Sequence, residues 1–165
     1  MIESVSAPLT PIGLHSSGPI PSKDLNAVVT PELERLLNEL VPFAERSLSD
    51  HGWFDPYGGT ITVDTAIEHI SVETESGDQS TAEELFNALV VDLRKGADEG
   101  AYVATAIFSD VQITAGGTKT FAINVCLEHV CGVSVEVNIP YRQNAESAIE
   151  YGESVAKRAR PRVFS

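Results

Sequence analysis

The chain has 165 residues, of which 42% are hydrophobic, and a formal net charge of −13 at pH 7. This length corresponds to one domain, and the composition is ordinary for a globular protein. The negative charge argues against nucleic-acid binding through a broad basic surface, and no apolar run approaches the ~20 residues of a membrane-spanning helix. The N-terminal residues lack the basic start and long apolar core of a secretory signal, so we expect a cytoplasmic protein.

Three regions are predicted along the chain. Residues 1–29 are rich in proline and glycine and show no helical or strand period, so we predict an extended or disordered arm. Residues 30–160 are predicted to form a single α+β domain, and residues 161–165 a short tail.

The first predicted helix follows the arm. Thr30 is suited to cap it, and Pro31 is suited to its first position. Apolar residues then recur at helical spacing and form one stripe: Leu33, Leu36, Leu37, Leu40, Ala44 and Leu48. We expect Pro42 to kink or divide this helix, and Gly52 lies just beyond its expected end.

A turn with three aromatic residues comes next. Trp53, Phe54 and Tyr57 lie close to Pro56 in a segment that ends in two glycines. Such a cluster either plugs one end of the domain, which we favour, or forms a binding lip. The segments Thr60–Asp64 and Ala66–Glu73 are predicted to be two short strands or one bent strand, followed by a polar loop over residues 74–79.

A second helix and a long strand are predicted after this loop. Ser80 with Glu83 has the spacing of a capping box, and Lys95 with Gly96 is a typical helix end. Tyr102–Thr114 is predicted to be a strand with apolar residues on both faces, which is typical of a central strand covered on both sides.

The longest regular alternation lies in Thr118–Tyr141, which predicts a hairpin of two antiparallel strands. After it, Ala145–Ala159 is predicted to be a helix, although its apolar stripe is weak. The resulting order is α-β-β-α-β-β-β-α, with a mostly antiparallel five-stranded sheet covered by helices. The same order occurs in roadblock-like and profilin-like sheets, an analogy that says nothing about function.

Cysteine, glutamate and histidine cluster near the turn of this hairpin. Cys126 and His129 are expected on opposite strand faces, and the sequence has no cysteine besides Cys126 and Cys131, so a metal site is disfavoured. A disulfide is disfavoured in a reducing compartment. We interpret both cysteines as small buried hydrophobes, with a thiol nucleophile as the weaker alternative.

Two acid–histidine pairs resemble each other. Glu68-His69 and Glu128-His129 each place an acid and a histidine on opposite faces of a strand. Neighbouring strands would bring the two histidines to one face, where a wet environment would make them a pH-sensitive patch. The simpler interpretation is two half-exposed strand histidines.

Several short segments carry a resemblance to a known family: Glu39–Ala44, His51–Gly58, Leu127–His129, Ile139–Arg142 and Tyr151–Glu153. They are similar to the PFA, HG-F-P-G, LEH and PYR segments of an uncharacterised family of small bacterial proteins, over roughly Leu33 to Ala156. The resemblance implies that the turn at His51–Gly59 and the hairpin end at Glu128 recur in the family. It implies no catalytic residues, because the family has no assigned activity.

The charge is uneven along the chain. Four basic residues lie in the last nine positions, which leaves 24 acidic residues against 7 basic ones, or −17, over residues 1–156. We interpret this as an acidic surface with a solvated basic tail, and keep open that the acidic surface captures a basic partner.

The sequence contains no phosphate loop, dinucleotide fingerprint or nucleophile elbow. We therefore expect a non-enzymatic module, without cofactor or metal, that binds another protein or itself as a homo-oligomer, in an immunity-type or accessory role. The interface candidates are Trp53, Phe54, Tyr57, His69, Glu128 and His129. One alternative is a small hydrolase-like enzyme that uses His69 or His129 with a neighbouring acid or cysteine. The other is a small-ligand sensor with an apolar cavity.

Overall fold

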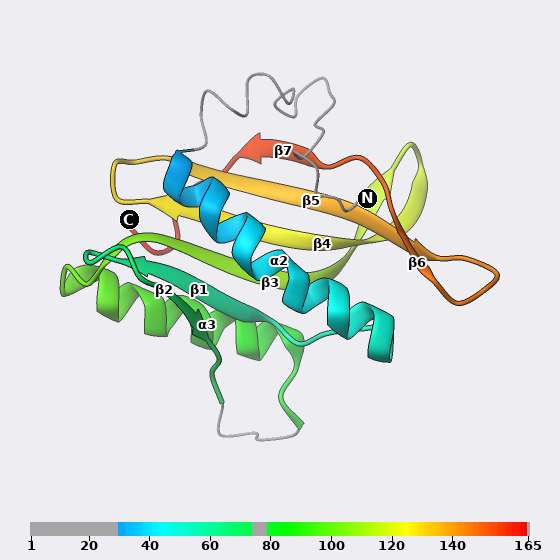
Figure 1. Cartoon of the computed structure of the whole chain (residues 1–165), viewed down its shortest axis with the longest axis horizontal. Coiled ribbons are helices and arrows are strands. Elements are labelled where there is room, and N and C mark those ends of the chain that lie inside the picture. The colour runs from blue at the N-terminus through cyan, green and yellow to red at the C-terminus, as the bar shows by residue number, and fades with distance from the viewer. Residues whose placement is uncertain (1–29, 74–78, 165) are drawn as a thin grey trace.

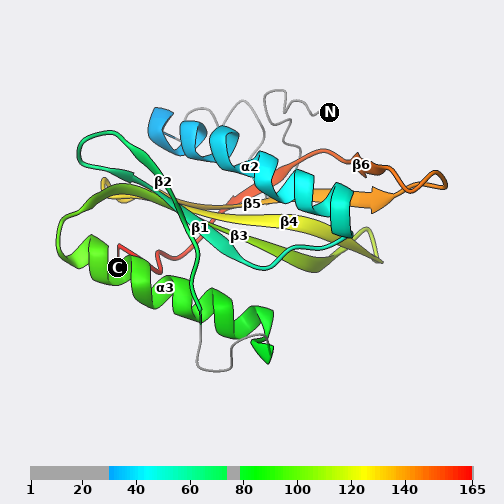
Figure 2. The same ribbon diagram turned by 60° about the horizontal axis from the view of Figure 1, so that its bottom comes forward.

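The computed structural model describes residues 30–73 and 79–164, which form an antiparallel sheet between two helices (Figures 1 and 2). The helices are α2 (Pro31–His51) and α3 (Ala82–Asp98). The strands are β1 (Tyr57–Thr62), β2 (Ile67–Ile70), β3 (Tyr102–Ala115), β4 (Thr118–His129), β5 (Ser134–Gln143), β6 (Ile149–Tyr151) and β7 (Val155–Arg158). The predicted arm over residues 1–29 and residues 74–78 of the predicted loop lie outside the described residues.

The sheet has the order β2-β1-β3-β4-β5-β6, with β7 also paired to β5. Every pairing is antiparallel, which confirms the predicted α+β class with an antiparallel sheet. Figure 2 shows α2 over one face of the sheet and α3 over the other. The central position of β3, apolar on both faces, is also confirmed.

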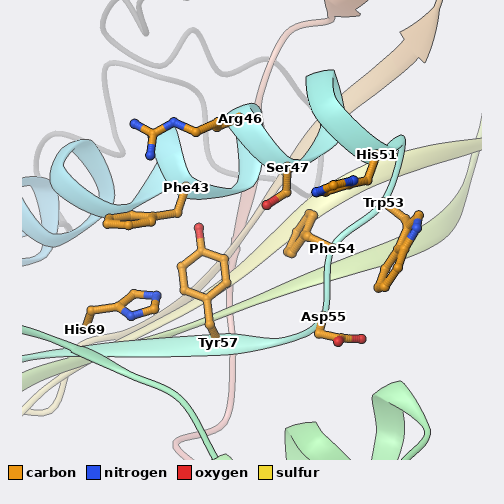
Figure 3. Close-up of a pocket in the computed structure, with 9 residues that line it drawn as sticks. All are labelled: Phe43, Arg46, Ser47, His51, Trp53, Phe54, Asp55, Tyr57 and His69. Carbon is orange, nitrogen blue, oxygen red and sulfur yellow. The ribbon is translucent and has the colours of Figure 1, made fainter. Parts of the chain in front are cut away.

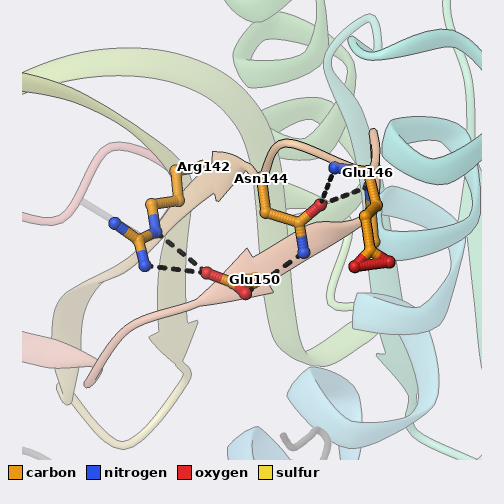
Figure 4. A network of polar contacts seen from close by, with 5 residues as sticks. Arg142, Asn144, Glu146 and Glu150 are labelled. Atoms are coloured by element: carbon orange, nitrogen blue, oxygen red, sulfur yellow. Dashed lines mark hydrogen bonds and ion pairs between the residues drawn. The ribbon is translucent and has the colours of Figure 1, made fainter.

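The predicted last helix, Ala145–Ala159, is wrong, and so are the predicted strand count and element order. This segment forms β6 and β7, so the described sheet has seven strands instead of five. The Asn144 side chain accounts for the turn that leads into β6. Its oxygen accepts from the N–H of Glu146 at 2.9 Å and from the N–H of Ala148 at 3.0 Å. Glu150 then bonds the side chains of Asn144 and Arg142 across the hairpin (Figure 4).

Helix α2 begins and ends as predicted. The Thr30 hydroxyl accepts from the N–H of Leu33 at 3.2 Å, and Gly52 ends the helix with a φ of 82°. Pro42 lies inside a helix that it does not divide. The predicted leucine stripe is buried against the sheet, so burial of one helix face accounts for the position of α2.

Helix α3 differs from the prediction at both ends. The capping box is formed by Thr81 with Glu84, one residue later than the predicted pair of Ser80 with Glu83. Gly96 does not end the helix, which continues to Asp98. A β-carbon at Gly96 would lie 2.3 Å from the Tyr102 ring, so this glycine is there for close packing of α3 on the sheet.

The two sides of the sheet have different cores. The α2 side holds the large apolar cluster, whose strand members include Ile61, Phe108, Ile123, Val125, Leu127 and Val137. The α3 side holds a small cluster of Leu89, Leu93, Ile107, Cys126 and Val163. Buried polar strand residues share the α3 side by register: Thr60, Thr105, Ser109, Asn124 and Glu128. The α2 side is therefore the main source of hydrophobic stability.

Candidate functional site

An open pocket of about 340 Å³ lies between the C-terminal half of α2, the aromatic turn and β2 (Figure 3). Its volume is at the lower end of the ~300–1,000 Å³ usual for ligand pockets. The lining residues are Phe43, Arg46, Ser47, His51, Trp53, Phe54, Asp55, Tyr57 and His69. Four of the six predicted interface residues therefore line one pocket.

Tyr57 forms part of the buried wall of this pocket. Its hydroxyl donates to the carbonyl of Leu40 at 2.6 Å and accepts from the N–H of Ala44 at 3.1 Å. These two groups are one helical turn apart, so the hydroxyl lies between backbone hydrogen-bonding groups of α2, beside Pro42. The Tyr57 ring stacks on Phe108 with 4.8 Å between centroids, and burial raises the pKa of the phenol well above its usual value. Tyr57 is fixed in place and is not a mobile lip.

His69 and Phe43 form the side of the pocket next to the sheet edge. Their rings stack with centroids 4.7 Å apart, and His69 also lies 5.1 Å from the Tyr57 ring. Partial burial lowers the pKa of His69, which favours the neutral form of its ring. Phe43 remains 41% exposed, and Arg46 lies 5.9 Å from its ring centroid. This side combines an exposed aromatic ring with a neutral imidazole.

Trp53 and Phe54 have opposite roles in the aromatic turn. Phe54 is buried at 7% exposure, whereas Trp53 is 57% exposed at the rim. The N–H of Phe54 donates to Asp110 at 3.4 Å, and the Tyr141 hydroxyl donates to the other oxygen of Asp110 at 2.5 Å. The interpretation of this turn as a plug therefore holds for the buried Phe54 and Tyr57, whereas Trp53 is exposed at the rim of the pocket.

Glu128, a predicted interface residue, lies on the opposite side of the sheet and is 3% exposed. Its carboxylate accepts from the backbone N–H groups of Arg162, Val163 and Phe164 at 2.8, 2.9 and 3.0 Å. Arg162 also lies 5.4 Å from the Phe86 ring centroid, and Val163 is 1% exposed. Glu128 therefore anchors the backbone of the C-terminal segment against α3, whereas the four basic residues predicted to be solvated, Lys157, Arg158, Arg160 and Arg162, are exposed.

His129, the sixth interface candidate, also lies away from the pocket. Its Nε2 atom lies 3.3 Å from a carboxylate oxygen of Glu32 without an aligned hydrogen bond, and its Nδ1 atom accepts from the N–H of Cys131 at 3.0 Å. His69 and His129 share the α2 side, but β1 and β3 lie between their strands, which separates them by roughly 14 Å of sheet. The two acid–histidine pairs do not form one patch.

The structure keeps Cys126 apart from His129, one of the thiol–histidine combinations considered from the sequence. Cys126 is buried on the α3 side, where burial raises the pKa of its thiol to about 12, whereas His129 lies on the α2 side. Cys131 is exposed, which corrects the expectation that both cysteines are buried, and neither cysteine forms a disulfide. Within residues 30–73 and 79–164, no group of histidine, cysteine and acidic residues is arranged to hold a metal ion.

Phe43, Arg46 and His51 line the pocket but were not among the interface candidates. The sequence contained a signal for Phe43, because this aromatic residue lies outside the leucine stripe of α2 and so is not needed for the core. Arg46 and His51 follow it by three and eight positions on the same helix. Only the packing of β2 beside α2 shows that these residues face one pocket.

Comparison of the chain with protein-family models, with curated proteins and with solved structures found no significant match. Among the described residues, neither helix is both long and apolar enough to cross a membrane.

Proposed function

We propose that this chain is a non-enzymatic protein-binding module whose recognition site is the pocket between α2, the aromatic turn and β2. The observation that carries the proposal is the pairing of Phe43 and Trp53, two exposed aromatic side chains that flank one open pocket. Behind them, Tyr57 and Phe54 are buried and held by hydrogen bonds. Exposed aromatic anchors around a preformed cavity are typical of the energetic centre of a protein interface.

The charge of the chain favours a basic partner. The net charge is −13, and long-range attraction would steer a basic protein toward this surface. The exposed acids Asp50 and Asp55 lie at the end of α2 and in the aromatic turn. Association with such a partner would weaken as salt is added, because salt screens exposed charges.

A binding comparison with point variants tests this proposal. Tagged wild-type protein and the Phe43→Ala and Trp53→Ala variants would be used to capture partners from cytoplasmic extract, with Val91→Ala as the matched control. Val91 is 70% exposed on α3, on the opposite side of the sheet. We expect one protein to be captured by wild type and the control, and both pocket variants to bind it at least ~10-fold more weakly.

Two results would contradict the proposal: capture that the pocket variants leave unchanged, or no captured protein at all. The variants are suitable for this test because Phe43 and Trp53 are exposed, and exposed substitutions usually change stability by less than about 0.5 kcal/mol. Circular dichroism of each variant would confirm that the fold is retained.

The pocket volume also favours a second candidate function, the small-ligand sensor. A cavity of about 340 Å³ lined by aromatic rings is large enough for a small planar molecule. Trp53 is the single tryptophan of the chain and lines this pocket, so its fluorescence reports binding directly. Saturable quenching by one member of a library of small aromatic compounds, lost in Phe43→Ala, would favour the sensor; uniform weak quenching would exclude it.

A further inference from the structure

Strand β2 forms one edge of the sheet and borders the pocket. Its inner side pairs with β1, and no described strand pairs with its outer side. Natural proteins commonly protect such edges with charged side chains, above all lysine, with proline, with a bulge or by keeping the strand very short, and β2 has four residues and one charged side chain, Glu68. The sequence of β2, Ile67-Glu68-His69-Ile70, contains neither proline nor lysine, and its register with β1 is regular. The edge is therefore able to pair with another strand.

The hydrogen bonds of the β1–β2 hairpin show which backbone groups face outward. The N–H of Thr62 donates to the carbonyl of Ala66 at 2.9 Å, so Ala66 faces β1. Hydrogen-bonded and non-hydrogen-bonded positions alternate along an antiparallel pair. Glu68 then faces β1 as well, and the N–H and C=O groups of Ile67 and His69 point away from the sheet.

An added strand would place a side chain at the pocket. A residue that exchanges both backbone hydrogen bonds with His69 would lie directly opposite it, with its side chain on the same face of the sheet. That face carries α2, and there His69 stacks under Phe43 at the side of the pocket. The incoming side chain would therefore lie next to these two rings. The flanking residues of the added strand would lie on the α3 side, opposite Glu68 and Ile70.

The charges near β2 indicate the composition of the added strand. Residues 64–73 contain Asp64, Glu68 and Glu73 and no lysine or arginine. Arg35 donates to the carbonyl of Thr65 at 2.8 Å, at the turn that precedes β2. Glu68 is the only charged residue of β2 itself, and it is exposed. A basic residue next to the pocket residue would lie opposite Glu68, and opposite charges across a strand pair are favourable.

We infer that the partner binds as an extended segment added antiparallel to the outer edge of β2, with an apolar side chain in the pocket beside Phe43 and His69 and a basic residue opposite Glu68. This inference rests on the proposed protein-binding function and names the form and chemistry of the ligand. Strand addition obtains affinity from main-chain hydrogen bonds and specificity from pockets that receive alternate side chains.

The test uses the synthetic peptide acetyl-Lys-Val-Lys-Phe-Lys-Val-Lys-amide with the full chain. In the inferred register its phenylalanine lies opposite His69, the following lysine opposite Glu68 and the following valine opposite Ile67. Trp53 fluorescence would measure binding, and amide hydrogen exchange of Ile67 and His69 would report whether their N–H groups become hydrogen-bonded. We expect saturable binding with slowed exchange at both amides.

Backbone N-methylation separates strand addition from binding of side chains alone. A methyl group on the phenylalanine nitrogen removes a hydrogen bond to the His69 carbonyl, and we expect affinity to fall at least ~10-fold. A methyl group on the nitrogen of the following lysine is the matched control, because that N–H points away from β2. We expect this control to bind within about threefold of the parent peptide, and the Glu68→Lys variant to bind the parent more weakly.

The inference is overturned if the parent peptide does not bind, if both N-methylated peptides bind like the parent, or if Trp53 responds while exchange at Ile67 and His69 stays unchanged. None of these outcomes contradicts the proposed function. That proposal is tested separately, by whether Phe43→Ala and Trp53→Ala lose binding to the captured partner. Conversely, if the captured partner binds both pocket variants as tightly as wild type, the proposed function is contradicted regardless of how the peptide behaves.

Discussion

The His69 ring stacks on the Phe43 ring with 4.7 Å between centroids, and this contact joins the edge strand β2 to helix α2. Partial burial lowers the pKa of His69 in the folded chain. Below the pKa of the unfolded chain, the unfolded state therefore binds more protons at this position than the folded state. The stability that neutral His69 provides is complete above the unfolded pKa of about 6.5 and is lost as pH falls toward the folded pKa.

Replacing His69 by phenylalanine keeps an aromatic stack and removes this titration. We expect His69→Phe to lose less stability than wild type between about pH 7 and about pH 5. The two proteins should differ by less than ~1 kcal/mol in the unfolding free energy lost between these pH values, because His69 is partly exposed and solvent screens its charge. Urea unfolding at both pH values measures it, with His51→Phe as the exposed control. Equal pH dependence in His69→Phe and wild type would show that His69 is not the source of this pH-dependent stability.

Glu128 is predicted to be essential for holding the C-terminal segment. Substitution by alanine would leave three backbone N–H groups without their acceptor, which we expect to cost about 3 kcal/mol of unfolding free energy. The control is Glu136→Ala, whose ion pair with the exposed Lys157 should contribute less than ~1 kcal/mol. Urea unfolding of both variants measures the difference. Equal losses would show that the three bonds contribute no more than the exposed ion pair.

Asp110 is a half-buried carboxyl group that links the aromatic turn to β5. Burial raises its pKa in the folded chain, although hydrogen bonds from Tyr141 and Phe54 act in the opposite direction. A raised folded-state pKa gives a contribution that is present at acid pH and is lost as pH rises through that pKa. We expect Asp110→Asn to be at least as stable as wild type at pH 7. The difference in stability between variant and wild type should be smaller at about pH 4. Thermal unfolding at both pH values provides the measurement.

The exposed Asp55, in the same turn, supplies the control Asp55→Asn, which should change stability at neither pH. If Asp110→Asn instead loses more than ~2 kcal/mol at both pH values, the carboxylate itself is needed to hold Phe54 and Tyr141.

Gly96 is expected to respond to alanine in the opposite direction from an ordinary helical glycine. In an exposed helix interior, alanine is more favourable than glycine by about 1 kcal/mol. Here the added β-carbon would lie 2.3 Å from the Tyr102 ring, so we expect Gly96→Ala to cost about 1–3 kcal/mol. Introducing it into a Tyr102→Ala background should remove that cost, because the ring is absent. Additive losses in the double variant would rule out this contact as the cause.

Local patterns predicted those parts of the fold whose burial follows a simple period. The leucine stripe predicted α2, and the alternation in Thr118–Tyr141 predicted β4 and β5. The segment Ala145–Ala159 failed because its structure depends on partners outside it: the Asn144 side chain starts a turn, and β5 has an edge with which both short strands pair. Tertiary pairing of this kind overrides a weak helical stripe.

The site was predictable in part for the same reason. Trp53, Phe54 and Tyr57 are close in sequence, so the sequence showed their cluster directly. Phe43 joins them only because β2 packs beside α2, which no local period shows. Glu128 was selected as an interface residue because it forms an acid–histidine pair with His129 at the hairpin end, whereas its role as acceptor for residues 162–164 depends on a contact 34 to 36 positions away.

The distance in sequence between Glu128 and residues 162–164 affects the order in which contacts form during folding. Strands β3, β4 and β5 follow one another through short turns, and contacts that are local in sequence form early. The contacts of Val163 with the α3-side cluster close a much longer loop, so we expect them to form after this meander is in place. The same segment should then open before the meander in native-state fluctuations, and the amide of Phe164 should exchange with solvent long before that of Val125.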